Sequence, residues 1–209
     1  MFHPLLMMTY MLVVLLVSNP YQFGVFSIAD QWKLILLVFL STFVMPAFAL
    51  VLMRSLNMVE SISLHERKER IGPYIITAVF YLWMFVNFKH NQTIPFALTV
   101  AALGATIALF GVFFFNNFTK ISAHAAGVGG LLGLTAINSF YFSFDTFSLN
   151  TWLFGTLEVS TNFLLLLVIV LAGIVCTSRL FLKAHTPGQV YSGLAVGFVA
   201  QFLALWFLQ

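Results

Sequence analysis

Long apolar runs separated by short polar segments constrain the fold of this chain more than any other feature. Runs near residues 32–53, 73–88, 94–115, 124–141, 159–181 and 187–208 approach the roughly 20 residues that a helix needs to cross a bilayer. An earlier run, residues 4–17, is shorter, and it is either a short spanning helix or a re-entrant one. Only 7% of the 209 residues are charged, which leaves little chain for a soluble domain. The sequence therefore predicts an all-α, polytopic transmembrane helical bundle with six to seven membrane helices, forming a single domain over residues 1–209.

Three polar segments interrupt these runs and hold most of the charge. They are the first polar segment, residues 66–73 (ERKERIGP), the second, residues 120–124 (KISAH), and the third, residues 178–189 (SRLFLKAHTPGQ). Two predicted spans separate the first segment from the second, and two separate the second from the third, so all three emerge on one face of the membrane. Ionisable side chains at a membrane boundary are costly unless they are paired or functional. We therefore expect the three segments to meet and form a site for an oxyanion.

The charge distribution and the single cysteine exclude several other classes of protein. Seven of the nine Lys and Arg residues lie at or beside the polar segments, so a general nucleic-acid-binding surface is not indicated. Cys176 is alone, which rules out an intramolecular disulfide, and the five histidines lack the spacing typical of a structural zinc site. The centres of the runs carry no ionisable residues, which disfavours a small transporter. We expect membrane lipids as partners, no nucleic acid, and neither a metal nor another cofactor.

Small residues recur at a spacing of four in two of the predicted helices. Gly129 and Gly133 share one face of the helix near residues 124–141, and Gly193 and Gly197 share a face of the last helix. Such pairs let helices approach closely in lipid. Between the predicted helices, residues 143–157 combine acidic and aromatic side chains, which favours an interfacial turn with aromatic anchors.

The third polar segment resembles a motif of the type 2 phosphatidic acid phosphatase superfamily. That family's pattern SRxxxxxHxxxD is matched at Ser178, Arg179 and His185, whereas Gln189 occupies the Asp position. The second segment is similar to the PSGH motif of the same family, and it keeps Ser122 and His124.

The first polar segment resembles the family's KxxxxxxRP motif only loosely. Pro73 is kept, Gly72 stands where Arg is expected, and Arg67 and Arg70 are nearby substitutes. The alternating charges of this segment are equally typical of a solvated helix face. The three matches nevertheless follow the order of the family in a chain of fitting length and hydropathy.

The resemblance implies a membrane-embedded phosphatase that hydrolyses a lipid phosphate or diphosphate. By that resemblance His185 attacks phosphorus to form a phosphohistidine, and His124 protonates the leaving oxygen. The resemblance also implies phosphate-binding residues, which are Arg179, Ser122, Lys120, Arg67 and Arg70. The chemistry fits these residue types, because phosphoryl transfer depends mostly on positioning and on stabilising negative charge. Lys183 is equally well explained as a cation that extends to the membrane boundary.

Gln189 is the main departure from the family pattern. Its amide oxygen can accept a hydrogen bond from His185, but it brings no charge to offset a phosphorylated ring. In a comparable histidine–carboxylate pair, replacing the acid by an amide lowers turnover by about 10⁴. Two alternatives therefore stay open: a catalytically weakened relative that binds anionic lipid headgroups, and a lipid phosphotransferase. Glu66 and Glu69 are candidates for a replacement acid because they lie on the same face.

The membrane orientation follows from two opposing arguments. The excess of cations on the face of the polar segments favours a cytoplasmic location by the positive-inside tendency. Several of these cations belong to the expected site, however, and the resembled family works on the outer face. We therefore expect an integral protein of a bacterial-type inner membrane whose site faces the periplasm.

Overall fold

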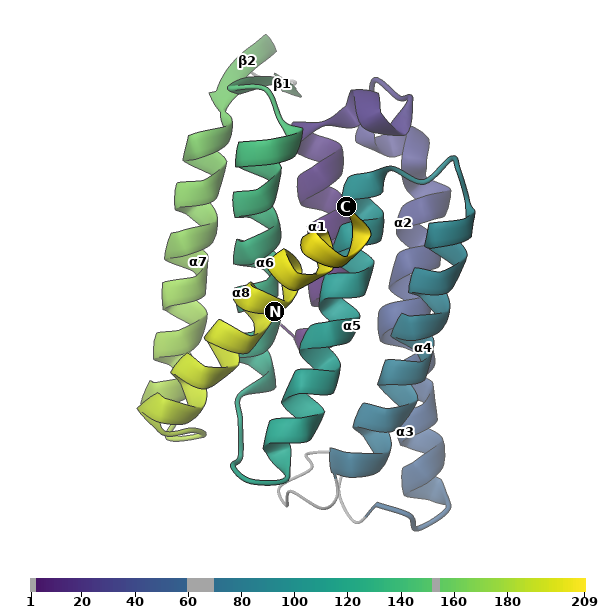
Figure 1. The fold of residues 1–209 in the computed structure, drawn as a ribbon, viewed down its shortest axis with the longest axis vertical. Coiled ribbons are helices and arrows are strands. Elements are labelled where there is room, and N and C mark those ends of the chain that lie inside the picture. The colour runs from purple at the N-terminus through teal and green to yellow at the C-terminus, as the bar shows by residue number, and fades with distance from the viewer. Residues whose placement is uncertain (1–2, 60–69, 152–154) are drawn as a thin grey trace.

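The computed structural model describes residues 3–59, 70–151 and 155–209, and it confirms an all-α membrane bundle. Within these residues, six helical segments are long and apolar enough to cross a membrane, so the chain is an integral membrane protein. The first of them combines α2 (Trp32–Phe39), a π-helical turn (Leu40–Val44) and α3 (Met45–Ser55). The others are α4 (Ile71–His90), α5 (Phe96–Asn116), α6 (Ala123–Ile137) with a π-helical turn (Asn138–Phe142), α7 (Thr161–Phe181) and α8 (Pro187–Leu208). Most of these helices run side by side, whereas α8 crosses the bundle obliquely (Figure 1).

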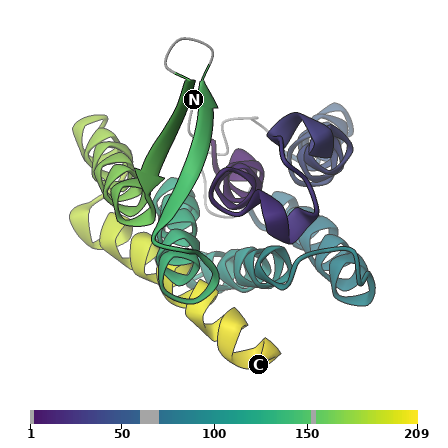
Figure 2. The ribbon, with the colours of Figure 1, turned by 90° about the horizontal axis from the view of Figure 1, so that it is seen from above.

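The short apolar run near the N-terminus forms a buried helix of half the usual length. A 3₁₀ turn (Pro4–Leu6) leads into α1 (Met7–Ser18), whose 12 residues extend about 18 Å, far less than the roughly 30 Å of a bilayer core. Leu12, Leu15 and Leu16 are fully buried, and Met8 and Met11 are nearly so. Viewed from above, α1 lies inside the bundle, between α2 and α6 (Figure 2). The seventh membrane helix is therefore an internal one that does not span the bilayer.

Close packing of α6 against α8 rests on the predicted glycine pairs. A Cβ atom at Gly133 would lie 2.8 Å from the Phe198 carbonyl oxygen, and one at Gly197 would collide with the Ala126 carbonyl oxygen. The two helices can therefore approach only because these positions lack side chains. The backbone N–H of Ser122 also donates to the Gln189 carbonyl oxygen at 3.1 Å, which joins the start of α6 to the start of α8.

A buried polar cluster fixes the other end of α1. Asn138, in the π-helical turn after α6, donates to the Ser18 hydroxyl at 2.9 Å and accepts from the Asn19 amide at 2.5 Å. The Ser143 hydroxyl donates to the Asn19 side-chain oxygen at 2.7 Å. Because buried polar groups are costly without partners, this cluster holds the C-terminal end of α1 against α6.

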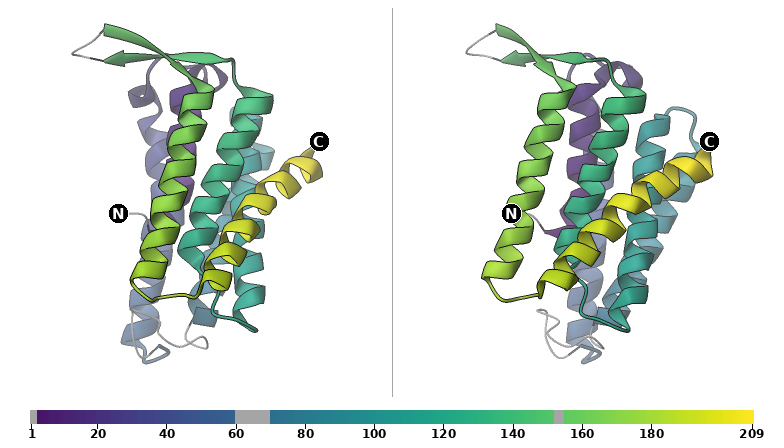
Figure 3. Two further views of the ribbon diagram at one scale, coloured as in Figure 1. Left: turned by 90° about the vertical axis from the view of Figure 1, so that its left-hand side faces the viewer. Right: turned by 60° about the vertical axis from the view of Figure 1, so that its left-hand side comes forward.

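Residues 143–157 contain β-structure, which the sequence pattern did not predict. Strands β1 (Thr146–Thr151) and β2 (Gly155–Ser160) pair antiparallel, with Thr146 opposite Ser160. Pairing satisfies the backbone hydrogen bonds of a segment that has left the helical bundle. The strands project from one end of the molecule, opposite the end where α4, α6 and α8 begin (Figure 3).

Candidate active site

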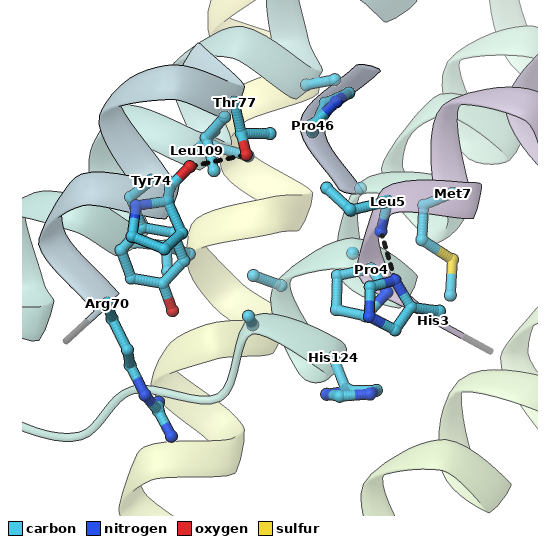
Figure 4. Close-up of a pocket in the computed structure, with 18 of the residues that line it drawn as sticks. His3, Pro4, Leu5, Met7, Pro46, Arg70, Tyr74, Thr77, Leu109 and His124 are labelled. Atoms are coloured by element: carbon cyan, nitrogen blue, oxygen red, sulfur yellow. Dashed lines mark hydrogen bonds between the residues drawn. The ribbon is translucent and has the colours of Figure 1, made fainter. Parts of the chain in front are cut away.

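A cavity of about 630 Å³ lies beneath the N-terminal end of α1, towards the end of the bundle that carries the polar segments. His3, Pro4, Leu5 and Met7, at the N-terminal end of α1, line one side of it. Its walls come from α3, α4, α5, α6 and the end of α7. Figure 4 shows Arg70 and Tyr74 on one side of this space, His3 and Pro4 on the other, and His124 between them.

The charged side chains that line the cavity are all cations. They are Arg70, Lys120, Arg179 and Lys183, and no described Asp or Glu residue lines the cavity. The cavity therefore favours an anion, and its two arginines suit the paired oxygens of a phosphate.

The hydrogen bonds of His185 fix its tautomer. Its Nδ1 lies 3.0 Å from the Lys120 carbonyl oxygen and 3.3 Å from the Gln189 Oε1 atom. A carbonyl oxygen cannot donate, so Nδ1 must carry the proton and Nε2 must carry the lone pair. Burial lowers the pKa of His185 below its ordinary value of 6.5; the nearby Arg70 and Lys120 charges act in the same direction, while the two hydrogen bonds oppose it. At neutral pH the ring is therefore neutral, with a nucleophilic Nε2 atom.

His124 has the opposite tautomer. Its Nδ1 lies 3.2 Å from the Arg179 Nη1 atom, and a guanidinium group can only donate. Nδ1 must therefore be the acceptor, which places the proton of the neutral ring on Nε2. The helix position of His124, in the first turn of α6, follows from Ser122, whose hydroxyl accepts from the Ala125 N–H at 3.3 Å and caps the helix.

His3 is a third imidazole of the cavity, and sequence reasoning missed it. Its ring lies edge-on to that of His124, with 6.0 Å between the centroids. The Leu5 N–H donates to the His3 Nδ1 atom at 3.3 Å, so the proton of the neutral ring is on Nε2. Burial lowers the pKa of His3, which keeps the ring neutral near pH 7. Nothing in the local sequence places residue 3 beside residue 124, because the contact depends on the length and tilt of α1.

The structure separates the predicted site residues into three groups. Arg70, Lys120, His124, Arg179 and His185 line the same cavity, as expected from the spacing of the polar segments. Ser122 and Gln189 do not line this cavity, although Gln189 contacts His185. Arg67 lies outside the described residues, and so do Glu66 and Glu69.

Ser122 and Gln189 do not line the cavity, so neither is placed to bind a phosphate directly. Ser122 is fully buried and caps α6, so its hydroxyl is already engaged by the Ala125 N–H. The Gln189 Oε1 atom contacts His185 and also accepts from the Thr186 N–H at 3.1 Å, within a capping box at the start of α8. Gln189 therefore contacts the cavity only through His185. Ser178, the first residue of the third motif, is exposed, and its hydroxyl donates to the Ile174 carbonyl oxygen.

Among the described residues, no three His, Cys, Asp or Glu side chains lie close enough together to hold a metal ion. Comparisons with known proteins do not identify a family for this chain, so its function has to be argued from the site. A scan against protein-family models, a search of curated proteins and a search of solved structures each returned no match.

Proposed function

We propose that this protein is a membrane-embedded phosphatase that hydrolyses a lipid phosphate or diphosphate through a phosphohistidine at His185. The observation that carries the proposal is the pair of opposite tautomers in one cationic cavity. His185 presents a lone pair on Nε2, and His124 presents a proton on Nε2. One ring is thus prepared as a nucleophile and the other as a donor to the leaving oxygen, which are the two functions that stepwise phosphoryl transfer needs.

The first chemical step follows from these two tautomers. The substrate phosphate draws Arg179 away from the His124 Nδ1 atom, which then takes up a proton from solvent, so that the ring becomes an imidazolium. The Nε2 lone pair of His185 attacks phosphorus and forms the P–N bond while the P–O bond to the lipid breaks. The His124 imidazolium gives its Nε2 proton to the departing oxygen. Arg70, Lys120 and Arg179 stabilise the charge on the remaining phosphoryl oxygens.

The second step returns the enzyme to its starting state. His124, now neutral and protonated only on Nδ1, accepts a proton on Nε2 from the water molecule that attacks the phosphohistidine. The P–N bond breaks, inorganic phosphate forms, and the bond electrons return to the His185 Nε2 atom. His124 then releases its Nδ1 proton to solvent as Arg179 returns to that atom, which restores the starting tautomer. The Lys120 carbonyl oxygen holds the Nδ1 proton of His185 throughout, so the ring keeps its tautomer without a carboxylate.

The apolar part of the cavity supports a lipid substrate rather than a small soluble phosphate. Beyond the cations, the cavity is lined by side chains such as Met7, Met8, Leu109 and Val112. The cavity also lies between membrane-spanning helices, where a lipid arrives by diffusion within the bilayer.

The test is phosphate release by purified protein in lipid nanodiscs, with a lipid phosphate and a lipid diphosphate as substrates. We expect His185→Ala to abolish release and to remove an acid-labile labelled phosphoprotein intermediate. His90→Ala is the matched control, because His90 is exposed near the opposite end of α4 and does not line the cavity. Equal release by wild type and His185→Ala would refute the proposal.

A second candidate function is the binding of anionic lipid headgroups without turnover. The observation in its favour is the partner of His185, which is an amide and a backbone carbonyl instead of a carboxylate. In that case the purified protein binds lipid phosphate and releases no inorganic phosphate, and Gln189→Glu does not introduce activity.

If glycerol or another alcohol accepts the phosphoryl group in place of water, the protein is instead a phosphotransferase.

We propose further that the cavity faces the periplasm of a bacterial-type inner membrane, as the resembled family does. Single cysteines at Ser55 and Ser148, which are exposed at opposite ends of the bundle, report on this in a Cys176→Ser background. A membrane-impermeant thiol reagent applied to intact cells is expected to label the cysteine at Ser55. Labelling at Ser148 alone would reverse the assignment.

A further inference from the structure

The cavity continues from its charged rim into the interior of the bundle. Its inner end is lined by Met8, Met11, Tyr81, Ala105 and Gly130, and we call this part the inner chamber. Along α6, the path from His124 at the rim to Gly130 corresponds to a rise of about 9 Å. Along α4, the rise from Tyr74 to Tyr81 is about 10 Å. The inner chamber is therefore a deep recess beneath α1.

The walls of the inner chamber are apolar and fixed in place. Met8 and Met11 are at most 2% exposed, and the phenol of Tyr81 is hydrogen-bonded to Thr42. No charged residue lines this inner part, since the four described cations of the cavity lie at the polar segments. A site with these walls suits a hydrocarbon chain.

Met11 and Gly130 close the inner end. A Cβ atom at Gly130 would lie 2.9 Å from the Met11 methyl group, so the methionine side chain fills the space that the glycine leaves. Behind them lies the fully buried Gln201, whose amide nitrogen donates to the Met11 sulfur at 3.9 Å. Gln201 thereby fixes the position of the Met11 side chain. The depth of the inner chamber depends on this contact.

We propose that the inner chamber binds the hydrocarbon chain of a single-chain lipid phosphate, with the chain directed into the bundle and its length limited by Met11. This inference rests on the proposed function, because the phosphate must lie at the cationic rim. At about 30 Å³ for each water-sized group, the 630 Å³ cavity holds roughly twenty non-hydrogen atoms. A phosphate and one chain of roughly a dozen carbons fit this volume, whereas the two chains of a diacyl lipid do not.

The experiment uses two matched ligand series with chains of 4, 8, 12 and 16 carbons. Alkyl phosphates report hydrolysis, and alkylphosphonates, which cannot be hydrolysed at the P–C bond, report binding by calorimetry to protein in nanodiscs. We expect Ala105→Leu, which fills the inner chamber, to weaken binding of the 12-carbon phosphonate at least tenfold and to leave the 4-carbon one unchanged. Met11→Ala is expected to shift the preferred chain towards 16 carbons. Ala195→Leu is the control, because Ala195 is exposed on α8.

The outcomes separate this inference from the proposed function. If wild type hydrolyses no member of the series, but Ala105→Leu and Met11→Ala shift the binding preference as stated, the proposed hydrolysis fails and the inner chamber stands. If wild type hydrolyses the series, but both variants keep its chain-length preference, the inner chamber is refuted and the proposed hydrolysis stands. Retained binding of the 4-carbon phosphonate shows that each variant is folded.

Discussion

Replacing Gln189 by glutamate tests the role of His185 with a single change of charge. The two side chains have the same length and shape, so a glutamate oxygen can occupy the position of Oε1, 3.3 Å from the His185 Nδ1 atom. The carboxylate also keeps the hydrogen bond from the Thr186 N–H at the start of α8. The variant therefore adds a negative charge beside the imidazole and leaves the local fold intact.

The expected effect can be worked from that distance. A unit positive charge on the ring and a carboxylate at 3.3 Å attract each other by about 1 kcal/mol in bulk water and about 5 kcal/mol at an effective dielectric constant of 20. Because both side chains are half-buried, the lower part of this range applies, roughly 1.4 to 2.8 kcal/mol. The positive charge develops on His185 as the phosphohistidine forms, so the rate constant of this step gains most of that energy. We expect kcat/KM to rise by about tenfold to a hundredfold.

The pH profile provides the second readout of this variant. A neighbouring carboxylate favours the charged imidazolium and so raises the pKa of His185. The protonated ring has no lone pair on Nε2, and the acidic limb of the kcat/KM profile is therefore expected to move to higher pH while the plateau rises. NMR of the protein labelled with ¹³C-histidine follows the same titration without substrate.

Two matched variants control for other effects of the substitution. Gln189→Leu removes the acceptor without adding charge, and it is expected to lower kcat/KM. Gln189→Asp carries the residue of the resembled motif on a side chain one methylene shorter, so its effect should have the same sign and a smaller size. An unchanged His185 titration in Gln189→Glu would refute the reasoning, whatever the activity.

Four further predictions follow from other contacts. In the wild type, burial lowers the pKa of His185, so the acidic limb of the kcat/KM profile is expected below pH 6.5; an acidic limb at or above 6.5 would contradict this. His3 lines the cavity with its proton on Nε2, and we expect it to donate to the bound phosphate; His3→Ala should then lower kcat/KM by about tenfold to a hundredfold, measured against His90→Ala, and equal values for these two variants would exclude a role for His3. Gly197→Leu should lower the Tm sharply because its side chain meets the α6 backbone, whereas Gly173→Leu, where an added Cβ contacts nothing within 4 Å, should not. Asn138→Ala leaves buried partners of this side chain unpaired and should destabilise the fold by about 1–3 kcal/mol in denaturant unfolding; an unchanged midpoint would show that the cluster is dispensable.

Hydropathy alone predicted the six long membrane helices and left the first, shorter run undecided. A bilayer requires about 20 apolar residues and internally satisfied backbone groups, so long apolar runs have few alternatives to helices. The parity of the spans then placed the polar segments at one end, where Arg70, Lys120, His124, Arg179 and His185 line one cavity. The glycine pairs of α6 and α8 were also predictable, because close helix contact in lipid requires small residues at regular spacing.

Local sequence predicted less well how two segments form their hydrogen bonds. Residues 143–157 read as an interfacial turn because their aromatic and acidic side chains suit a membrane surface, yet the backbone pairs as β1 and β2. Ser122 fitted a phosphate-binding motif, yet its hydroxyl caps α6. In both places a hydrogen bond to a nearby backbone group determines the local structure. The types of side chain in the segment do not predict such a bond.

By itself, then, the sequence determined an integral helical bundle with its cations gathered at one end, because the bilayer allows so few other arrangements. Only the tertiary structure decided what those cations surround. The packing of α1 against the bundle places His3 in the cavity lining, with its ring centroid 6.0 Å from that of His124. A backbone carbonyl of Lys120, which every residue possesses and no motif can specify, fixes the tautomer of His185. Such contacts join residues distant in the chain, so they exist only once the helices have packed.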